Sequence, residues 1–298
     1  MSRILLLGAH GQVGWELQRA LAPLGELVAL DRGGAPGLSG DLTQPDALAS
    51  TVRAVDPAIV VNAAAYTAVD RAESEPALAE AINAAAPAAL AAACAAGGAC
   101  LLHFSSDYVF DGSGNTPREE DAPTAPLSVY GRTKRDGEDA IRASGCRHLI
   151  LRTSWVYAAH GSNFARTMLR LASERDALKI VADQVGVPTG AELLADVSAH
   201  LLRHVAARPE LGGTYHCVPA GEVSWYAYAC HVIAAARAAG HPVRVPPHGI
   251  QPVSTADYPT PARRPLNSRL STRKLRGTFG LHLPPWQQGV DRLIAEIL

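Results

Sequence analysis

The sequence predicts an α/β fold: a doubly wound parallel sheet of the Rossmann type, with a smaller, interleaved C-terminal α/β substrate lobe. Two observations lead to this prediction. Short apolar runs alternate with longer alanine-rich segments from the start of the chain, and a glycine triplet follows the first run. The 298 residues are enough for one large domain or for a domain with a second lobe.

The first half of the chain supplies five expected strands, the apolar runs at 4–8, 26–31, 58–65, 100–106 and 148–154. Because these runs are apolar throughout rather than alternating, we expect strands buried on both faces of the sheet. The segments between the runs are long enough for crossover helices, at 13–22, 45–55, 75–96 and 129–143. Strand and helix therefore alternate, as a parallel sheet requires.

The alternation loosens after about Thr153. We expect residues 1–153 to form mainly an NAD(P)-binding Rossmann domain and residues 154–298 mainly a substrate-binding lobe. The later elements are expected as helices at 163–174, 191–207 and 224–239, strands at 178–182 and 214–218, and a proline-rich segment at 242–265.

Composition narrows the class of protein. The 27 basic and 28 acidic side chains leave a formal net charge of -1, without the basic excess of a protein that binds nucleic acid or a membrane surface. The five cysteines are dispersed and form no CxxC pair. No uninterrupted apolar stretch approaches the length that spans a bilayer, and the first run is too short for a signal peptide. We therefore expect a cytoplasmic protein.

The motif GAHGQVG places three glycines where the first strand turns into the first helix. Gly8 permits a tight turn, Gly11 lets the backbone approach a pyrophosphate, and Gly14 lets helix and strand pack closely. Asp31 ends the second predicted strand, where an acid binds the adenosine ribose hydroxyls. Arg32 beside it can accommodate a 2′-phosphate, so NADH and NADPH both stay open as cofactors.

A second acid follows in the segment GDLTQ. From this loop Asp41 can reach the adenine amino group, and Leu42 can cover the ring. The alternative is structural, because Asp41 taken alone is suited to cap the helix that begins near Pro45.

A candidate proton donor follows the fourth predicted strand. Reduction of a carbonyl leaves negative charge on its oxygen, which must be protonated or held by donors. Tyr130 and Lys134 stand four residues apart, so a helix places them on one face, and an ammonium there favours the phenolate and strengthens the phenol as an acid. Ser106 ends the strand at the edge where ligands bind parallel sheets, and can hydrogen-bond the carbonyl alongside Tyr130.

Longer motifs extend the pattern over nearly the whole chain: GAHGQVGWEL, VVNAAAYTAVDRAE, SSDYVFDG, PLSVYGRTK, RTSWVY, DQVGVPTGAELLAD, YPTPARRPLNSRLST and WQQGVDRLIAEIL. In their order and combination the chain resembles the extended short-chain dehydrogenase/reductases, and within them the enzymes that reduce a dTDP-4-keto-6-deoxy sugar. The resemblance implies NAD(P)H-dependent reduction of the C4 ketone of dTDP-4-dehydro-β-L-rhamnose to dTDP-β-L-rhamnose, a precursor of surface polysaccharide.

The resemblance also implies roles for single residues. Tyr130 and Lys134 would contact the nicotinamide ribose and serve the chemistry, with Tyr130 as proton donor. Ser106 stands where the family carries threonine or serine. The remaining residues of the cofactor cleft would be Gly11, Gln12, Val13, Asp31, Asp41, Leu42, Ala65, Tyr66 and Thr67.

On the substrate side, Ser106 and Asp107 would contact the sugar, and the Trp155 indole would cover its apolar C5 methyl group. The weaker assignments, suited to the nucleotide diphosphate, are Gln184, Arg264 and Arg269, with Asn267 and Ser268 in support. Some family members dimerise through a magnesium ion held by glutamates, and the matching positions are Glu16, Glu192 and Glu296.

Two other functions stay open. Another nucleotide-sugar 4-reductase or an epimerase of the same superfamily would use the same serine, tyrosine and lysine, since each moves a hydride at a sugar carbon. A non-catalytic subunit like the regulatory partner of methionine adenosyltransferase shares the fold. The sequence does not determine which face of the ketone meets the nicotinamide, nor, therefore, the product's stereochemistry at C4.

Overall fold

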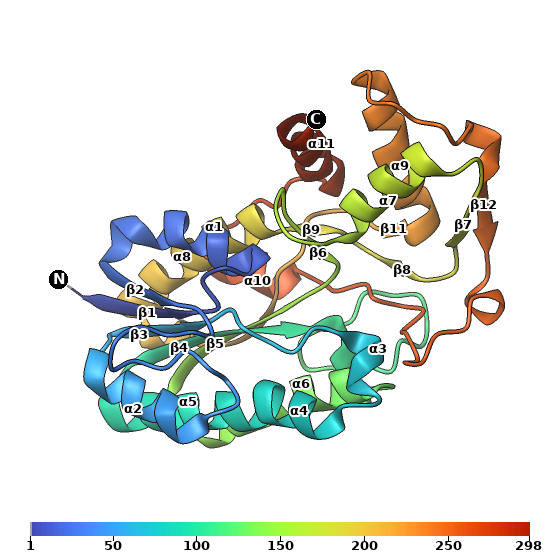
Figure 1. The fold of residues 1–298 in the computed structure, drawn as a ribbon. Coiled ribbons are helices and arrows are strands. Elements are labelled where there is room, and N and C mark those ends of the chain that lie inside the picture. The colour runs from blue at the N-terminus through green and yellow to red at the C-terminus, as the bar shows by residue number, and fades with distance from the viewer. Residues whose placement is uncertain (1) are drawn as a thin grey trace.

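The computed structural model describes residues 2–298. Within that range six parallel strands form the main sheet, in the order β10-β5-β4-β3-β1-β2 (Figure 1). Their bounds are β1 Arg3–Leu7, β2 Glu26–Leu30, β3 Ile59–Asn62, β4 Cys100–Ser106, β5 Arg147–Thr153 and β10 Gly213–His216. The chain leaves β1 toward β2 on one side and then crosses to β3 on the other. Ligands of such sheets bind at this switch point, beyond the carboxyl ends of the strands.

Helices cover both faces of the sheet, as predicted (Figure 1). One face carries α1 Gln12–Leu21, α8 Ala191–Ala207 and α10 Arg273–Phe279 over a core that includes Leu6, Leu102 and Leu151. The other carries α2 Pro45–Val55, α5 Ala86–Gly97 and α6 Val129–Ala143 over a core that includes Leu5, Leu101 and Ile150. Successive residues of β4 and β5 thus serve opposite cores, which explains why both runs are apolar throughout.

The five predicted strands are all present, but the expectation of complete burial is wrong for β2. Glu26 and Ala29 are exposed and only Leu30 is fully buried. The reason is its place in the sheet, because β2 is an edge strand and lacks a neighbour on one side.

The predicted helix 75–96 is interrupted. It consists of α4 Pro76–Glu80, a π-helical turn η2 Ala81–Ala85 and α5. Pro87 lacks the N–H group that an unbroken helix needs, which accounts for the wider turn just before it. The turn directs the Asn83 side chain inward, where its amide donates to the Tyr66 carbonyl (3.0 Å) and to Thr133 Oγ1 (3.2 Å).

The same segment, Pro76–Gly97, is long and apolar enough to cross a membrane by length and composition, which the sequence reading did not anticipate. The polar Glu80 and Asn83 lie within it, and 44% of its most apolar window is buried inside the fold. Because α5 packs against α2 and α6, we interpret the segment as a core helix.

The second lobe has its own apolar core, built around Met168, Tyr228, Val232, Trp286 and Val290. Its main elements are α7 Phe164–Glu174, β7 Leu178–Val181, α9 Trp225–Ala238, β12 Ile250–Val253 and α11 Trp286–Ile297. Its shorter elements are β6 Val156–Tyr157, β8 Val185–Gly186, β9 Thr189–Gly190 and β11 Val223–Ser224. Outside the lobe, the short helix α3 Val69–Ala72 packs against α4 and α6. Between the lobe elements the chain returns to the sheet through α8, β10 and α10 (Figure 1).

A buried ion pair joins α6 to β5. Arg152 Nε and a terminal nitrogen donate to the two Glu138 carboxylate oxygens at 2.8 and 2.6 Å, and both side chains are almost fully buried. Burial alone would raise the pKa of Glu138, but the hydrogen bonds and the charge of Arg152 hold this pKa below its usual value. The pair therefore stays charged inside the protein.

We predict that Glu138→Gln lowers the free energy of unfolding by about 3 kcal/mol, because it leaves the buried Arg152 charge uncompensated. Urea unfolding at neutral pH measures the change. The matched control is Glu174→Gln, which breaks an exposed pair with Arg170 and should cost at most about 0.5 kcal/mol. Equal effects of the two substitutions would contradict the prediction. Since folding lowers the Glu138 pKa, the difference should diminish as pH falls below its ordinary value of 4.5.

Candidate active site

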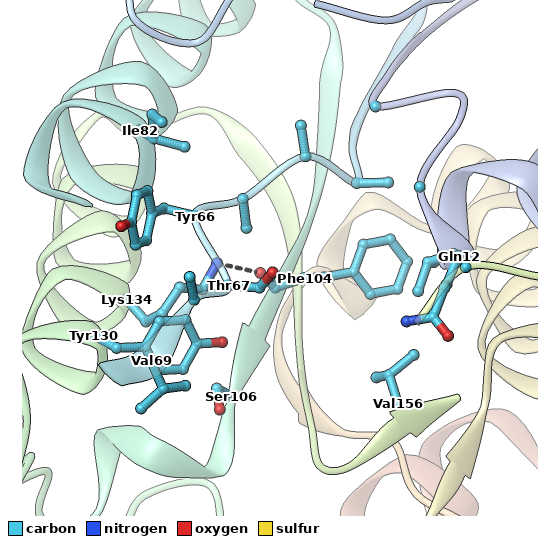
Figure 2. A pocket seen from close by; sticks show the side chains of 18 of the residues that line it. Gln12, Tyr66, Thr67, Val69, Ile82, Phe104, Ser106, Tyr130, Lys134 and Val156 are labelled. Atoms are coloured by element: carbon cyan, nitrogen blue, oxygen red, sulfur yellow. Dashed lines mark hydrogen bonds between the residues drawn. The ribbon is translucent and has the colours of Figure 1, made fainter. Parts of the chain in front are cut away.

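A cavity of about 1090 Å³ opens at the carboxyl ends of β1, β3 and β4. Its lining comes from the glycine-rich turn, the loops after β2 and β3, the end of β4, the start of α6 and the segment after β5. In Figure 2, Tyr66, Lys134, Tyr130 and Ser106 lie on one side of the cavity, and Gln12 and Val156 lie opposite them. The cavity is large enough for a ligand the size of a dinucleotide.

The glycine-rich turn has no room for side chains at two of its positions. A Cβ on Gly8, whose φ is +83°, would lie 2.7 Å from the Ala64 nitrogen, and one on Gly14 would lie 1.9 Å from the Gly8 carbonyl oxygen. Helix α1 begins at Gln12, and its N-cap, Gly11, supplies no side-chain hydrogen bond. The first N–H groups of α1 can therefore bind a pyrophosphate, which fits a dinucleotide.

Asp31 lies in the lining directly after β2, as predicted. One carboxylate oxygen accepts the Gly33 N–H at 2.8 Å, and the other lies 2.9 Å from His10 Nδ1. Arg32 is exposed beside it. Both a ribose hydroxyl acceptor and a cation for a 2′-phosphate are thus present at this end of the cavity.

Asp41 does not cap α2, whose N-cap is Gln44. Its carboxylate instead accepts the Thr43 N–H at 3.0 Å and the Thr43 hydroxyl at 2.8 Å, and lies 3.5 Å from Arg32 Nε. The capping alternative is therefore wrong, because the carboxylate closes a local turn two residues before the helix. Leu42 lies in the cavity lining next to it.

The loop after β3 carries Ala65, Tyr66 and Thr67 into the lining. Asn83 holds this loop from the π-helical turn: its Oδ1 accepts the Tyr66 N–H at 2.9 Å, in addition to the bond its amide donates to the Tyr66 carbonyl. The Tyr66 hydroxyl donates to Glu75 at 2.5 Å. An irregular helix thus fixes one wall of the cavity.

Tyr130 lies in the first turn of α6, which Ser128 caps by accepting the Gly131 N–H at 3.2 Å. Ser106, at the end of β4, lies on the same side of the cavity (Figure 2). Burial raises the pKa of the Tyr130 phenol to about 12, although a hydrogen bond with Ser106 acts in the opposite direction. In this structure Tyr130 is a protonated phenol.

The predicted lowering of the Tyr130 pKa by Lys134 is therefore not found. The reason is the position of the amine, since Lys134 Nζ donates to the Phe104 carbonyl at 2.7 Å (Figure 2) and lies 3.2 Å from His103 Nε2. Burial lowers the pKa of Lys134 itself to about 8, against the opposing charge of Glu138. An amine with this pKa can gain or lose a proton near neutral pH.

The predicted sugar-binding residues Asp107 and Trp155 both line the cavity. Burial raises the pKa of Asp107 to about 6, while hydrogen bonds with Ser268 and Ser106 counteract the rise. Trp155 has a left-handed φ of +48°, unusual for a bulky residue, and its ring stacks on Trp225 with centroids 3.6 Å apart. The two indoles form an aromatic wall, defined here as Trp155 and Trp225.

The other proposed substrate residues lie outside the cavity lining. Arg264 donates to both carboxylate oxygens of Asp70, at 3.0 and 2.8 Å, and Arg269 donates to both of Glu222, at 2.8 and 3.1 Å. The Gln184 amide donates to Thr255 Oγ1. Nearby, Asn267 donates to the carbonyls of Ser113 and Thr116, whereas Ser268 hydrogen-bonds Asp107.

Glu16, Glu192 and Glu296 line one smaller cavity of about 230 Å³, together with Arg19 and Arg292. Across residues 2–298, however, no group of three or more His, Cys, Asp or Glu side chains is placed to hold a metal ion. Burial raises the pKa of Glu192, and Glu16 and Glu296 add to the rise. The magnesium prediction is not supported within a single chain.

Sequence reasoning missed several residues of the main cavity. His10, Arg71, Tyr108, His160 and Trp225 all belong to its lining. Arg71 and Tyr108 stand inside motifs that the sequence had already marked, VVNAAAYTAVDRAE and SSDYVFDG, so motif membership was an available signal. Trp225 lies far from the other site residues in sequence, and only the fold brings it to the cavity.

Comparison with known proteins gives a consistent result. A family model described as the RmlD substrate binding domain matches residues 1–298. The dTDP-4-dehydrorhamnose reductase of Escherichia coli (strain K12) is 53% identical over 294 residues, covering 99% of this chain and 97% of that protein. A probable dTDP-4,6-dihydroxy-2-methyloxan-3-one 4-ketoreductase of Streptomyces antibioticus is 40% identical, covering 99% and 96%. The crystal structure of dTDP-4-dehydrorhamnose reductase from Bacillus anthracis in complex with NADP has a TM-score of 0.87 at 33% identity, covering 99% of each chain.

The glycine-rich turn gives a test of the cofactor site. We predict that Gly14→Ala weakens NADPH binding at least tenfold and lowers stability, because the new Cβ would overlap the Gly8 carbonyl and force the turn apart. Fluorescence titration of NADPH and thermal unfolding measure the two effects. Gly97→Ala is the matched control, since a Cβ there meets no described atom within 4 Å. Unchanged NADPH affinity in Gly14→Ala would contradict the assignment.

Proposed function

The chain belongs to the family of the RmlD substrate binding domain, and from this premise we propose that it is a dTDP-4-dehydrorhamnose reductase. It is an NAD(P)H-dependent oxidoreductase that reduces the C4 ketone of dTDP-4-dehydro-β-L-rhamnose to dTDP-β-L-rhamnose. One observation carries the proposal: Tyr130, Ser106 and Lys134 lie in the same cavity as the glycine-rich turn that fits a dinucleotide.

The nicotinamide cofactor supplies the hydride when it is bound. The protein's task is to orient the ketone and to neutralise the charge that develops on its oxygen. We assign that task to the hydroxyls of Ser106 and Tyr130, with Tyr130 as the proton donor. A phenol whose pKa burial raises to about 12 is fully protonated beforehand, and Lys134, with a pKa of about 8, is suited to exchange protons in the same cleft.

We assign the sugar to the region between Asp107 and the aromatic wall. A 6-deoxy sugar has an apolar methyl group that an indole face can cover, and a buried carboxylate can accept hydrogen bonds from hydroxyls. Arg264 and Arg269 stay proposals for the nucleotide diphosphate. Each is held by a carboxylate in this structure, so binding a diphosphate would mean exchanging Asp70 or Glu222 for the ligand.

A second candidate is a sister reductase that produces the C4 epimer or acts on a related keto sugar. The observation in its favour is the Streptomyces antibioticus relative, a probable 4-ketoreductase whose name gives a different substrate, dTDP-4,6-dihydroxy-2-methyloxan-3-one. NMR identification of the product formed from enzymatically generated dTDP-4-dehydro-β-L-rhamnose distinguishes the two. Tight NADPH binding without any oxidation at 340 nm would favour the regulatory subunit instead.

The cellular compartment and the oligomeric state of the enzyme are also proposals. We place it in the cytoplasm, because its five cysteines are all free and four of them are buried. A homodimer is a further proposal, tested by light scattering. Such a dimer would bind magnesium only if carboxylates of both chains formed the site together, since the described residues of one chain contain no group of side chains placed to hold a metal ion.

We predict that Tyr130→Phe lowers kcat by about 10²–10⁴-fold, the usual contribution of a general acid, and leaves the affinity for NADPH nearly unchanged. NADPH oxidation and fluorescence titration measure the two quantities. Tyr215→Phe is the control, because its hydroxyl donates to the Leu211 carbonyl away from the cavity. Near-normal turnover in Tyr130→Phe would remove Tyr130 from the role of proton donor.

We predict that Asp31→Ala weakens NADH binding by about tenfold, the loss of a hydrogen bond to a charged group, and weakens NADPH binding less. NADPH carries a 2′-phosphate in place of the hydroxyl, so it loses less when the carboxylate is removed. Titration of both cofactors gives the ratio, and Asp176→Ala, which removes an exposed carboxylate paired with Arg244, is the control. Equal weakening of both cofactors would remove Asp31 from the ribose site.

A further inference from the structure

A buried polar chain lies behind Lys134 and is not used in the mechanism above. Asn62 on β3 and His103 on β4 are register partners in the parallel sheet, so their side chains lie next to each other on the face that α6 covers. Each is only 1% exposed. Lys134 reaches the same place from α6 and is 2% exposed.

The contacts run in one line. Asn62 Nδ2 lies 3.2 Å from His103 Nδ1, and His103 Nε2 lies 3.2 Å from Lys134 Nζ. The other end of the Asn62 amide is also bound, because its Oδ1 accepts the Ala64 N–H at 3.2 Å. Lys134 Nζ donates to the Phe104 carbonyl. Each side-chain nitrogen and oxygen of Asn62, His103 and Lys134 therefore has a partner within hydrogen-bond distance.

The direction of these bonds follows from the Ala64 N–H, which can only donate. The Asn62 oxygen must face it, so the Asn62 NH2 group faces His103 and donates to Nδ1. A ring nitrogen that accepts a hydrogen bond carries no hydrogen, and a neutral imidazole then carries its hydrogen on Nε2. This Nε2–H points at the Lys134 nitrogen.

An ammonium has three hydrogens and no lone pair, so it cannot accept a hydrogen bond from Nε2–H. A neutral amine can: its lone pair accepts from His103, one hydrogen goes to the Phe104 carbonyl, and one stays available toward the cavity. The arrangement thus favours the uncharged form of Lys134. Deep burial of Lys134 acts in the same direction.

We propose that His103 is a positioning residue: oriented by Asn62, it presents its Nε2–H to the Lys134 amine and stabilises the uncharged amine within the cofactor cleft. The proposal rests on the proposed function for its meaning in catalysis. There, once Tyr130 has given its proton to the ketone oxygen, the Lys134 ammonium passes a proton to the Tyr130 phenolate and becomes an amine, and His103 holds that amine in place.

Other ionisable groups near Lys134 are compatible with this role. Glu138, one turn further along α6, opposes loss of the charge on Lys134, but the same carboxylate is engaged by Arg152 from β5. Tyr130 stands one turn earlier on α6 as a protonated phenol. His103 itself stays neutral, since burial holds its pKa well below the ordinary value of 6.5, and any positive charge on Lys134 acts in the same direction.

The tautomer of His103 is directly measurable in the cofactor-free, unmodified protein. Two-bond proton–nitrogen NMR correlations of the imidazole rings distinguish hydrogen on Nε2 from hydrogen on Nδ1, and the His103 signals are those lost in His103→Gln. We expect hydrogen on Nε2 from about pH 6 to pH 9, without titration. Hydrogen on Nδ1, or a charged imidazolium in this range, would overturn the proposal.

The effect on Lys134 is measurable through its side-chain carbon. The lysines of the chain are Lys134, Lys179 and Lys274, and the last two are exposed, so they serve as reference signals in a carbon-labelled lysine spectrum. In Asn62→Asp the carboxylate can only accept, so it draws the His103 hydrogen to Nδ1 and leaves Nε2 free to accept from an ammonium. We expect the Lys134 pKa to rise by at least about one unit.

A second variant separates this route from the direct attraction between the new carboxylate and Lys134. In a His103→Leu background no imidazole connects residue 62 to Lys134, so Asn62→Asp should then shift the Lys134 pKa far less. An undiminished shift would show that the charge acts directly and would overturn the proposal. If the double variant fails to fold, the tautomer measurement on the unmodified protein still decides.

Activity gives the catalytic readout. In Asn62→Asp we expect the pH profile of kcat to move to higher pH together with the Lys134 pKa, while the KM for the sugar nucleotide stays within about twofold. A profile that stays in place while the Lys134 pKa moves would overturn the catalytic part of the proposal. Absence of turnover in the unmodified protein would instead count against the proposed function, because the NMR measurements need neither substrate nor cofactor.

Discussion

The close approach of Gly8 to Ala64 is the constraint on which the site depends. At the switch point of the sheet, the turns that follow β1 and β3 lie so near each other that a single Cβ on Gly8 would overlap the Ala64 backbone. This contact places the start of α1 beside the loop that carries Tyr66. The pyrophosphate site and the wall of the cavity next to it thus arise from one packing requirement between two backbones.

Helix α6 extends from the cofactor cleft, which Tyr130 and Lys134 line, to the buried ion pair of Glu138 with Arg152. Tyr130, Lys134 and Glu138 follow one another at intervals of four residues along one face. Lys134 and Glu138 are buried, whereas Tyr130 is half-buried and lines the cavity. Burying an amine and a carboxylate would destabilise the fold if they were left without hydrogen-bond partners. Strand β4 supplies His103 and the Phe104 carbonyl for Lys134, and strand β5 supplies Arg152 for Glu138, so the sheet provides partners for both buried ionisable groups.

The second lobe contributes through aromatic packing rather than charge. Trp155 occupies a left-handed backbone conformation that is costly for a bulky side chain, and its stacking on Trp225 helps to hold it there. Trp225 begins α9, whose inner face packs into the lobe core with Tyr228 and Val232. The aromatic wall is therefore supported by the core of the lobe.

The sequence by itself determined the alternation of strands and helices, the glycine-rich turn and the pairing of Tyr130 with Lys134, because each depends on residues close together in the chain. Residue spacing alone also placed α2, α6 and α8 within their observed bounds. It did not reveal the edge exposure of β2, the π-helical turn before Pro87 or the place of Trp225 in the cavity. Those depend on which strand lacks a neighbour and on which distant segments meet.

The same distinction applies to the electrostatics of the site. The sequence indicated that an ammonium would stand one helical turn from the phenol, but local spacing carries no information about burial or about partners from other strands. Only the tertiary structure showed that Lys134 is buried, that it meets His103 and the Phe104 carbonyl, and that burial raises the Tyr130 pKa. A side chain's charge state depends on its solvation and its neighbours, and both are set when the chain is packed.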